Sequence, residues 1–320
     1  MRPAPGAGAV PAQHSGRRGD ATHRPRIAIT LGDPRGIGPE VTARALADPS
    51  VSDIADFHVV GPTGTVFMPH TATGTWLPHG GTPLAGELAG VAIERAVDMA
   101  LSGEVDGIVT SPIDKSALLA GGYSYPGHTE MLASLAGART AMMLASDRLR
   151  VVLATTHIPL SHVVRELSAE LIERTASITR TGLAAWFGLE NARIALCALN
   201  PHAGDGGRFG NEDDTILRPA AEKAGILGPF PADTVFVRAM RGEFDAVIAP
   251  YHDVGMTAIK VASFGSAVNV TLGLPFPRTS PDHGTALDIA GQGIADASSM
   301  IAAIRLCAEI VSRVRARRTP

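Results

Sequence analysis

Three histidines lie at the ends of apolar runs that are typical of buried strands. LRVVLATTH ends at His157, RIALCALNPH ends at His202, and DAVIAPYHD carries His252. Because the carboxyl ends of parallel strands border the crevice in which α/β proteins bind ligands, we expect the three imidazoles to meet there. Three neutral imidazoles with open coordination positions form a catalytic divalent-metal site. Each histidine taken alone could equally be a hydrogen-bonded loop residue.

A second set of residues could hold an anion. Lys260, Asn269 and Arg278 follow one another at equal intervals, and GHTE places His128 and Thr129 at the start of an expected helix. Arginine offers a bidentate fork, lysine a compact charge, and a helix start free backbone N–H groups, a combination that suits a phosphate or carboxylate. A lone basic residue is most often surface charge, and Thr129 could simply cap its helix. The prediction therefore depends on the clustering.

Two further residues could move protons at such a site. The chain has three lysines among its 28 basic residues, and one of them, Lys115, follows an apolar run in TSPIDKSAL. Asp253 is next to His252, where a carboxylate could orient the imidazole or carry a proton. Lys115 could also be structural, and Asp253 could also cap a helix.

A glycine-rich turn follows the first apolar run. LGDPRGIGPE, residues 31–40, contains three glycines, but their order is not the GxGxxG of a dinucleotide-binding Rossmann fold. An ordinary strand-to-helix turn explains this spacing as well as a ligand-binding loop does.

Short apolar runs alternate with longer amphipathic ones, which is the pattern of an α/β fold with a mostly parallel sheet. Amphipathic spacing predicts helices over 85–102 and 298–316, whereas 61–86 could be a loop or a small β excursion. The apolar runs predict strands at 26–33, 56–62, 106–112, 140–146, 149–157, 193–202, 245–253 and 266–276.

Composition excludes several classes of partner. The chain has 320 residues, 45% of them hydrophobic, and a formal net charge of −3. Without a basic excess we expect no nucleic-acid partner, and without a long apolar run we expect no membrane span. The first 24 residues lack the apolar core of a secretory signal, and the two cysteines form no CxxC pair. We therefore expect a disordered tail over 1–24 and a cytoplasmic protein.

Seven blocks of this sequence together resemble the 4-hydroxythreonine-4-phosphate dehydrogenase family. They run in order from about Arg26 to the C-terminus: ITLGDPRGIGPEV, TSPIDKSAL, GHTEMLA, ATTHIPL, NPHAGDGGRFGNED, PYHDVGMTAIK and NVTLGLPFPRTSPDHGTALDIAGQGIADASSM. The resemblance implies two α/β/α domains with mostly parallel sheets, as in isocitrate and isopropylmalate dehydrogenases, and an active site in the cleft between them. The first domain would comprise 25–126 plus 285–320 and the second 127–284.

The resemblance also assigns site residues. It implies a homodimer in which His157, His202 and His252 hold a divalent metal ion, zinc, magnesium or cobalt, with His252 coming from the other subunit. The substrate contacts it implies are His128, Thr129, Lys260, Asn269 and Arg278.

A more distant likeness to isocitrate and isopropylmalate dehydrogenases places the cofactor. It implies that HGTALDIAGQGIAD lines the pocket for the adenosine end of NAD, and that the acidic Asp288 faces a ribose hydroxyl and disfavours NADP. The residues that it places in this pocket are Gly284, Thr285, Asp288 and Asp296.

The implied reaction is a metal-dependent oxidation of 4-phosphooxy-L-threonine with decarboxylation, linked to NAD or NADP, a step of pyridoxine 5′-phosphate biosynthesis. Arg35 and Arg208 depart from the family pattern. Branches of the family that act on 4-phosphothreonate or on dihydroxycyclohexadiene dicarboxylates therefore stay open as alternatives. A three-histidine metal hydrolase and a non-catalytic ligand-binding protein are rivals from other classes.

Overall fold

A single mixed sheet of eleven strands runs through the protein. The computed structural model describes residues 24–263 and 266–318, so the tail predicted over 1–24 lies, except for Arg24, outside the described residues. The strand order is β3-β2-β1-β4-β11-β10-β5-β6-β9-β7-β8. The strands are β1 (Arg26–Thr30), β2 (Asp56–Thr63), β3 (Thr71–Thr75), β4 (Gly107–Thr110), β5 (Ala141–Ala145), β6 (Arg150–Leu153), β7 (Ile194–Cys197), β8 (Leu227–Phe230), β9 (Ala246–Ala249), β10 (Val268–Leu272) and β11 (Arg278–Pro281).

The pairing confirms the prediction of an α/β fold with a mostly parallel sheet. Seven of the ten strand pairs are parallel. The three antiparallel pairs, β11 with β10, β10 with β5 and β5 with β6, lie together in the middle of the sheet. Hydrogen bonding thus continues from the half of the sheet that ends at β3 to the half that ends at β8. Two separate sheets, one in each domain, were expected instead. The division into domains remains a prediction.

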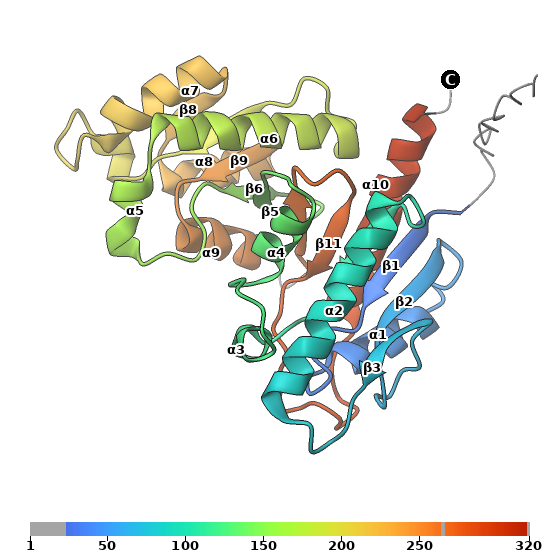
Figure 1. Ribbon diagram of the computed structural model, residues 1–320. Helices are drawn as coiled ribbons and strands as arrows, with labels where there is room; N and C mark the ends of the chain where they lie inside the picture. Colours follow the sequence, from blue (N-terminus) through green and yellow to red (C-terminus); the bar gives the residue numbers. More distant parts are fainter. Residues whose placement is uncertain (1–23, 264–265, 319–320) are drawn as a thin grey trace, which may run out of the picture.

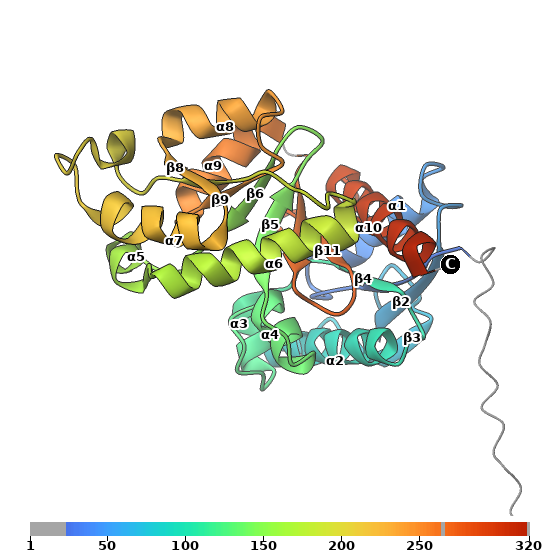
Figure 2. The same ribbon diagram turned by 90° about the horizontal axis from the view of Figure 1, so that it is seen from above.

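Helices cover both faces of the sheet. Figure 1 shows the arrangement, and Figure 2 shows α2 and α10 on opposite sides of the sheet. The α-helices are α1 (Gly38–Ala47), α2 (Gly81–Leu101), α3 (Lys115–Ala120), α4 (His128–Leu135), α5 (Leu160–Glu166), α6 (Ala169–Phe187), α7 (Arg218–Ala224), α8 (Ala232–Met240), α9 (His252–Ser263) and α10 (Ser298–Arg318), and the short helical turns are η1 (Pro201–Gly204) and η2 (Asp213–Leu217). Within the described ranges, no helix is long and apolar enough to cross a membrane.

The hydrophobic core is continuous on one face and divided on the other. On the first face, residues of α1, α6, α7 and α10 form one cluster that spans both halves. On the opposite face, α2, α3 and α4 cover one cluster, and α8 and α9 cover a second. Strand alternation explains the division of residues, because Ile27 and Ile29 of β1 face the first cluster whereas Ala28 faces α2. The gap between the two clusters on this face leaves space for a ligand.

All eight predicted strands and both predicted helices are present. The uncertain segment 61–86 contributes the end of β2, the edge strand β3 and the start of α2, while β8 and β11 were not predicted. Both cysteines are buried and unpaired, and burial raises the pKa of each thiol to about 12. Neither thiol is therefore a reactive thiolate at neutral pH.

Gly86 is the point at which α2 approaches α3 most closely. A Cβ atom at this position would lie 1.7 Å from the backbone oxygen of Ala117. We predict that Gly86→Ala lowers the free energy of unfolding by about 1–3 kcal/mol, because α3 would have to move. The control is Glu87→Ala on the exposed side of α2, with an expected change within about 0.5 kcal/mol. Urea unfolding measures both, and equal midpoints for Gly86→Ala and wild type would contradict this packing.

Candidate active site

A cavity of about 590 Å³ lies between the two halves of the sheet. Strands β10 and β11 contribute Asn269, Arg278 and Ser280, α4 contributes its first turn, and α9 contributes His252 and Lys260. All five residues predicted to contact the substrate line this one cavity: His128, Thr129, Lys260, Asn269 and Arg278. The anion-binding set inferred from clustering is thus brought together by the fold.

Strand alternation determines which side chains of β10 and β11 face the cavity. In β11, Arg278 and Ser280 line the cavity, whereas the hydroxyl of Thr279 between them donates to the backbone oxygen of Ala303 in α10, 2.8 Å away. Asn269 pairs with Ser280 across the antiparallel β10–β11 ladder. Two neighbouring strands therefore present their polar residues to the same side.

Arg278 is a buried cation without a carboxylate partner. Its side chain is 2% exposed. It donates from Nη1 to Thr271 Oγ1 at 2.9 Å and from Nη2 to Thr110 Oγ1 at 2.5 Å. Among the described residues no carboxylate lies within ion-pair distance of it, and its Nε has no hydrogen-bond partner. Burial lowers the pKa of Arg278 to about 10, the charge of Glu130 on the same cavity wall limits this fall, and the guanidinium remains charged at neutral pH.

Three further polar atoms of this cavity are buried without a partner in the described part of the chain. They are Nε2 of His128, Oδ1 of Asn269 and Nε2 of His283. Burial, together with the charge of Arg278, lowers the pKa of His128 well below its usual value, so this imidazole is neutral. Buried polar atoms are normally hydrogen-bonded, and an unpaired group marks a place for a ligand or water. The wall around Arg278 is therefore suited to a bound anion that carries both acceptor and donor groups.

Asp282 is a residue of this cavity that sequence reasoning missed. Its Oδ2 lies 3.3 Å from Nζ of Lys260. Burial raises the pKa of Asp282, and the opposing charge of Lys260 limits this rise. The pair fixes the position of the ammonium group. Asp282 directly follows β11, and because this short strand was not predicted, no sequence signal placed it at the site.

The three histidines do not all meet within one chain. The rings of His157 and His252 lie 5.5 Å apart, whereas His202 in η1 is exposed and contacts Phe209. In the part of the chain that the structure describes, no three His, Cys, Asp or Glu side chains are grouped as metal ligands. Within one chain His252 lies beside His157, whereas the resemblance implied that His252 comes from the other subunit. Which of the three histidines a second subunit supplies stays a prediction.

The strand order explains this result. Strands β6 and β9 are hydrogen-bonded neighbours, so the segments that follow them bring His157 and His252 together. Strand β7 lies on the far side of β9, and the turn after it has left-handed backbone at His202 and Ala203, with φ of 53° and 54°. This turn carries His202 away from the other two.

The surroundings of the histidine pair suit metal ligation. Nδ1 of His252 lies 2.7 Å from Oδ1 of Asp253, which leaves Nε2 of His252 for a ligand. Burial, with the charge of Lys115, lowers the pKa of His157 and keeps this imidazole neutral. Lys115 also lines the main cavity, at the start of α3, where the side chain of Asp114 caps the helix by accepting from the N–H of Ala117.

The predicted cofactor residues follow the cavity along the chain. Gly284 lines its end, and the backbone oxygen of Thr285 accepts from the N–H of Ile37 at 2.9 Å. Asp288 is exposed. Asp296 accepts from the N–H and hydroxyl of Ser298, each at 2.9 Å, and so caps the start of α10. The contacts of Asp296 are therefore those of a helix cap.

The family described as pyridoxal phosphate biosynthetic protein PdxA matches residues 50–307. The chain belongs to the PdxA family. The 4-hydroxythreonine-4-phosphate dehydrogenase of Geobacter metallireducens is 43% identical, covering 90% of this chain and 96% of that protein. A crystal structure of 4-hydroxythreonine-4-phosphate dehydrogenase from Klebsiella pneumoniae is 37% identical, with a TM-score of 0.80, covering 90% of this chain and 98% of that one.

The PdxA-family chain also shares the expected wider fold. Isocitrate dehydrogenase from Methylococcus capsulatus has a TM-score of 0.52 at 17% identity, covering 92% of this chain and 88% of that one. This likeness concerns the fold alone. It confirms the prediction of an isocitrate dehydrogenase-like α/β architecture.

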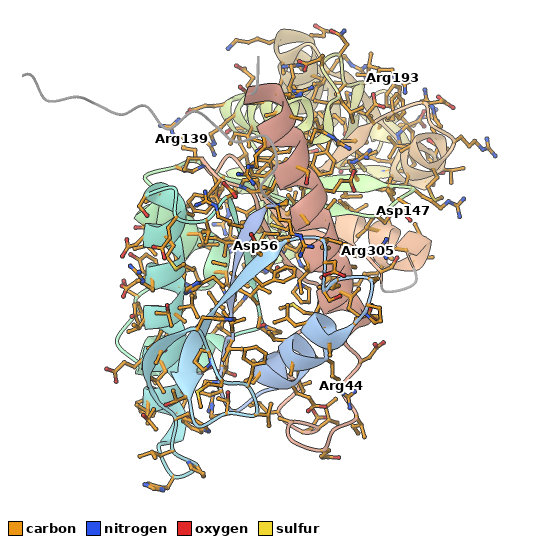
Figure 3. The ribbon with its side chains drawn as sticks, turned by 90° about the vertical axis from the view of Figure 1, so that its right-hand side faces the viewer. Arg44, Asp56, Arg139, Asp147, Arg193 and Arg305 are labelled. Carbon is orange, nitrogen blue, oxygen red and sulfur yellow. The ribbon has the colours of Figure 1, made fainter. Side chains whose placement is uncertain are left out.

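Arg278→Met tests whether the buried cation binds an anion. A ligand at 100 times its Kd stabilises the folded state by about 2.7 kcal/mol. We predict that inorganic phosphate raises the melting temperature of the wild type and that Arg278→Met loses most of this shift, because methionine replaces the apolar stem of arginine but carries neither the charge nor the N–H donors. The control is Arg139→Met, at an exposed position labelled in Figure 3, which should keep the shift. An undiminished shift in Arg278→Met would contradict the assignment.

The buried, neutral His128 makes stability depend on pH. Unfolded histidine binds its proton near pH 6.5, whereas the lowered pKa of folded His128 resists protonation. Stability should therefore fall as the pH drops below about 6.5, by at most about 1.4 kcal/mol per pH unit from this group. Urea unfolding from pH 7 to pH 5 should show a shallower loss in His128→Gln than in wild type. In the control His162→Gln, at an exposed site, the slope should match wild type, and an unchanged slope in His128→Gln would refute the prediction.

Proposed function

We propose that the chain is a metal-dependent, NAD-linked 4-hydroxythreonine-4-phosphate dehydrogenase that oxidises and decarboxylates 4-phosphooxy-L-threonine to 3-amino-2-oxopropyl phosphate. The observation that carries the proposal is the Arg278 guanidinium, buried and bonded only to hydroxyls among the described residues. A charged group in such a position is costly unless an anion completes it. The substrate is inferred from the name of relatives that are about 40% identical to this chain, 4-hydroxythreonine-4-phosphate dehydrogenase.

The chain's own residues bind and orient this substrate. Arg278, with His128 Nε2 on the same cavity wall, would hold the phosphate, and Asn269 Oδ1 would accept a hydrogen bond from the substrate. Lys260, fixed by Asp282, would hold a second negative group such as the carboxylate. The Thr129 hydroxyl at the start of α4 adds a donor. Two anchored ends fix the carbon chain between them.

The metal site fits the chain only when a second copy completes it. His157 and His252 offer two neutral imidazoles, and we propose that His202 of another copy supplies the third, in a homodimer with shared sites. Zinc, magnesium or cobalt are the candidate ions, and zinc suits an imidazole set best. When bound, the ion would polarise the substrate oxygens and the nicotinamide of NAD would accept the hydride.

The proton balance can be met within the cavity. Oxidation removes a hydride from carbon and a proton from the hydroxyl oxygen, and the carbon that loses carbon dioxide later takes up one proton. Lys115 lines the cavity next to His157 and is the candidate carrier of this proton. The contact of Asp253 with His252 makes Asp253 a positioning residue. The two unpaired, buried thiols agree with a place in the reducing cytoplasm.

Turnover with a panel of substrates tests the proposal. Purified protein with NAD, a divalent metal ion and 4-phosphooxy-L-threonine should produce NADH and carbon dioxide in equal amounts. If NADH forms with 4-phosphothreonate or a dihydroxycyclohexadiene dicarboxylate instead, the chain belongs to another branch of the family. Ester hydrolysis without NADH would favour a metal hydrolase and overturn the dehydrogenase.

Hybrid dimers test the shared metal site. Two single variants carrying different affinity tags are co-expressed and purified through both tags, so that every dimer contains one copy of each. We predict that the His157→Ala and His202→Ala pair regains about half of wild-type activity, because one of its two sites is complete.

The matched control is the His157→Ala and His252→Ala pair, which should stay inactive because each chain contributes both residues to one site. Recovery in the second pair but not in the first would place His252, rather than His202, on the partner's side.

A further inference from the structure

The segment between β7 and α7 contains a run of left-handed backbone. His202, Ala203 and Asp205 have φ of 53°, 54° and 44°. Gly204, which lies among them, has φ of 85°. Left-handed backbone is unfavourable for a residue that carries a Cβ atom, and it persists only where surrounding contacts hold it. The position of His202 therefore depends on contacts made elsewhere in this segment.

Asp213 makes the first of these contacts. Its side chain is completely buried at the start of η2. Oδ1 accepts from the N–H of Leu199 at 2.8 Å, and Oδ2 accepts from the N–H of Asn200 at 3.0 Å. Both carboxylate oxygens are thus bonded to the backbone that follows β7. This one side chain joins the two ends of the loop 200–213, which carries His202.

A second contact closes the same loop. Nδ2 of Asn200 donates to Oε2 of Glu212 at 2.8 Å. Gly210 is packed against both groups, because a Cβ atom there would lie 2.5 Å from Oε2 of Glu212 and 2.7 Å from Nδ2 of Asn200. A Cβ atom on Gly204 would lie 2.9 Å from the backbone oxygen of Gly210. The base of the loop is therefore tightly packed.

The closed loop presents His202 away from its own chain. The imidazole is exposed, and its ring lies 6.1 Å from that of Phe209, which is 49% exposed. Figure 2 shows the segment between β7 and α7 at the outer end of the half of the sheet that ends at β8. Within the described ranges His202 joins no metal-ligand group of its own chain. This imidazole is therefore available to a second molecule.

We infer that Asp213 is a positioning residue for His202, and that its buried carboxylate holds the loop in the shape that presents this imidazole to the metal site of another copy. The inference rests on the proposed function, which assigns His202 to the site of a second copy. Because Asp213 is buried, it acts only through His202. The metal site that it serves therefore lies in the other chain of the dimer.

Asp213→Asn tests this role, because it replaces one buried acceptor by a donor. The N–H of Leu199 or that of Asn200 then loses its acceptor, which is unfavourable in a buried position. We expect the zinc affinity, measured by calorimetry, to fall about ten- to hundredfold, as it does when groups that hold metal ligands are removed. The phosphate-dependent melting shift of the cavity around Arg278 should stay as in wild type.

The matched control is Asp214→Asn, the same change at the neighbouring position. Asp214 is exposed and paired with Arg218 at 2.9 Å. This variant should bind zinc as tightly as wild type. An Asp213→Asn protein with the zinc affinity of Asp214→Asn would overturn the inference.

Hybrid dimers show on which copy Asp213 acts. In a dimer of Asp213→Asn with His157→Ala, one site combines the intact histidine pair of the first chain with the intact His202 loop of the second. We expect this dimer to bind about half as much zinc as wild type. The Asp213→Asn and His202→Ala pair should bind little zinc at the same concentration, because neither chain presents an intact His202. A chain that had simply lost its fold would restore neither pair.

The outcomes separate this inference from the proposed function. If the His157→Ala and His202→Ala dimer binds zinc but the Asp213→Asn and His157→Ala dimer does not, Asp213 serves the site of its own chain and the inference alone is overturned. If the His157→Ala and His202→Ala dimer binds no zinc, the shared site of the proposed function fails, and this inference fails with it.

Glu212→Ala is the second variant if Asp213→Asn yields no dimer. It removes the contact of Glu212 with Asn200 at a partly exposed position, where truncation leaves the fold intact. In the same two pairs it should restore zinc binding with His157→Ala and not with His202→Ala. The reverse pattern would overturn the inference.

Discussion

The buried guanidinium of Arg278 is the interaction around which the site is organised. A charge removed from water must be compensated, and among the described residues this one has two hydroxyls and no carboxylate within contact distance, while Glu130 acts on it from farther along the cavity wall. The fold can place it there because β11 lies inside the sheet, between a parallel neighbour, β4, and an antiparallel one, β10. Thr110 and Thr271, which hold its Nη atoms, come from those two strands. The two halves of the sheet thus meet at a charge that needs a ligand.

The same arrangement explains why the cavity opens on one face only. On the face covered by α1, α6, α7 and α10, a continuous apolar cluster joins the halves. On the other face the cluster under α2 and the cluster under α9 are separate, and polar side chains from α4, α9, β10 and β11 fill the interval. Because the continuous sheet connects the two halves, the substrate-binding side chains that each half contributes keep a fixed spacing.

Much of this could be predicted from the sequence, and the failures have physical causes. Apolar runs located eight strands, and clustering of basic and amide residues found the anion set around Arg278. Strands β8 and β11 were missed because each has four residues and includes a proline, so neither gives a periodic signal. The convergence of strand-end histidines holds for His157 and His252, whose strands are neighbours, and fails within one chain for His202. Strand order decides which of these histidines become neighbours, and the local hydrophobic periodicity of the sequence does not reveal strand order.

The most direct measurement compares kcat/KM for 4-phosphooxy-L-threonine and for the same molecule without its phosphate, in wild type and in Arg278→Met. If the buried guanidinium binds the phosphate, the wild type should prefer the phosphorylated substrate strongly, and the variant should lose about 100-fold of that preference, since truncating a buried charge pair costs about 3 kcal/mol. If the variant instead keeps the full preference for the phosphorylated substrate, the phosphate is held elsewhere, and the central role given to Arg278 is wrong.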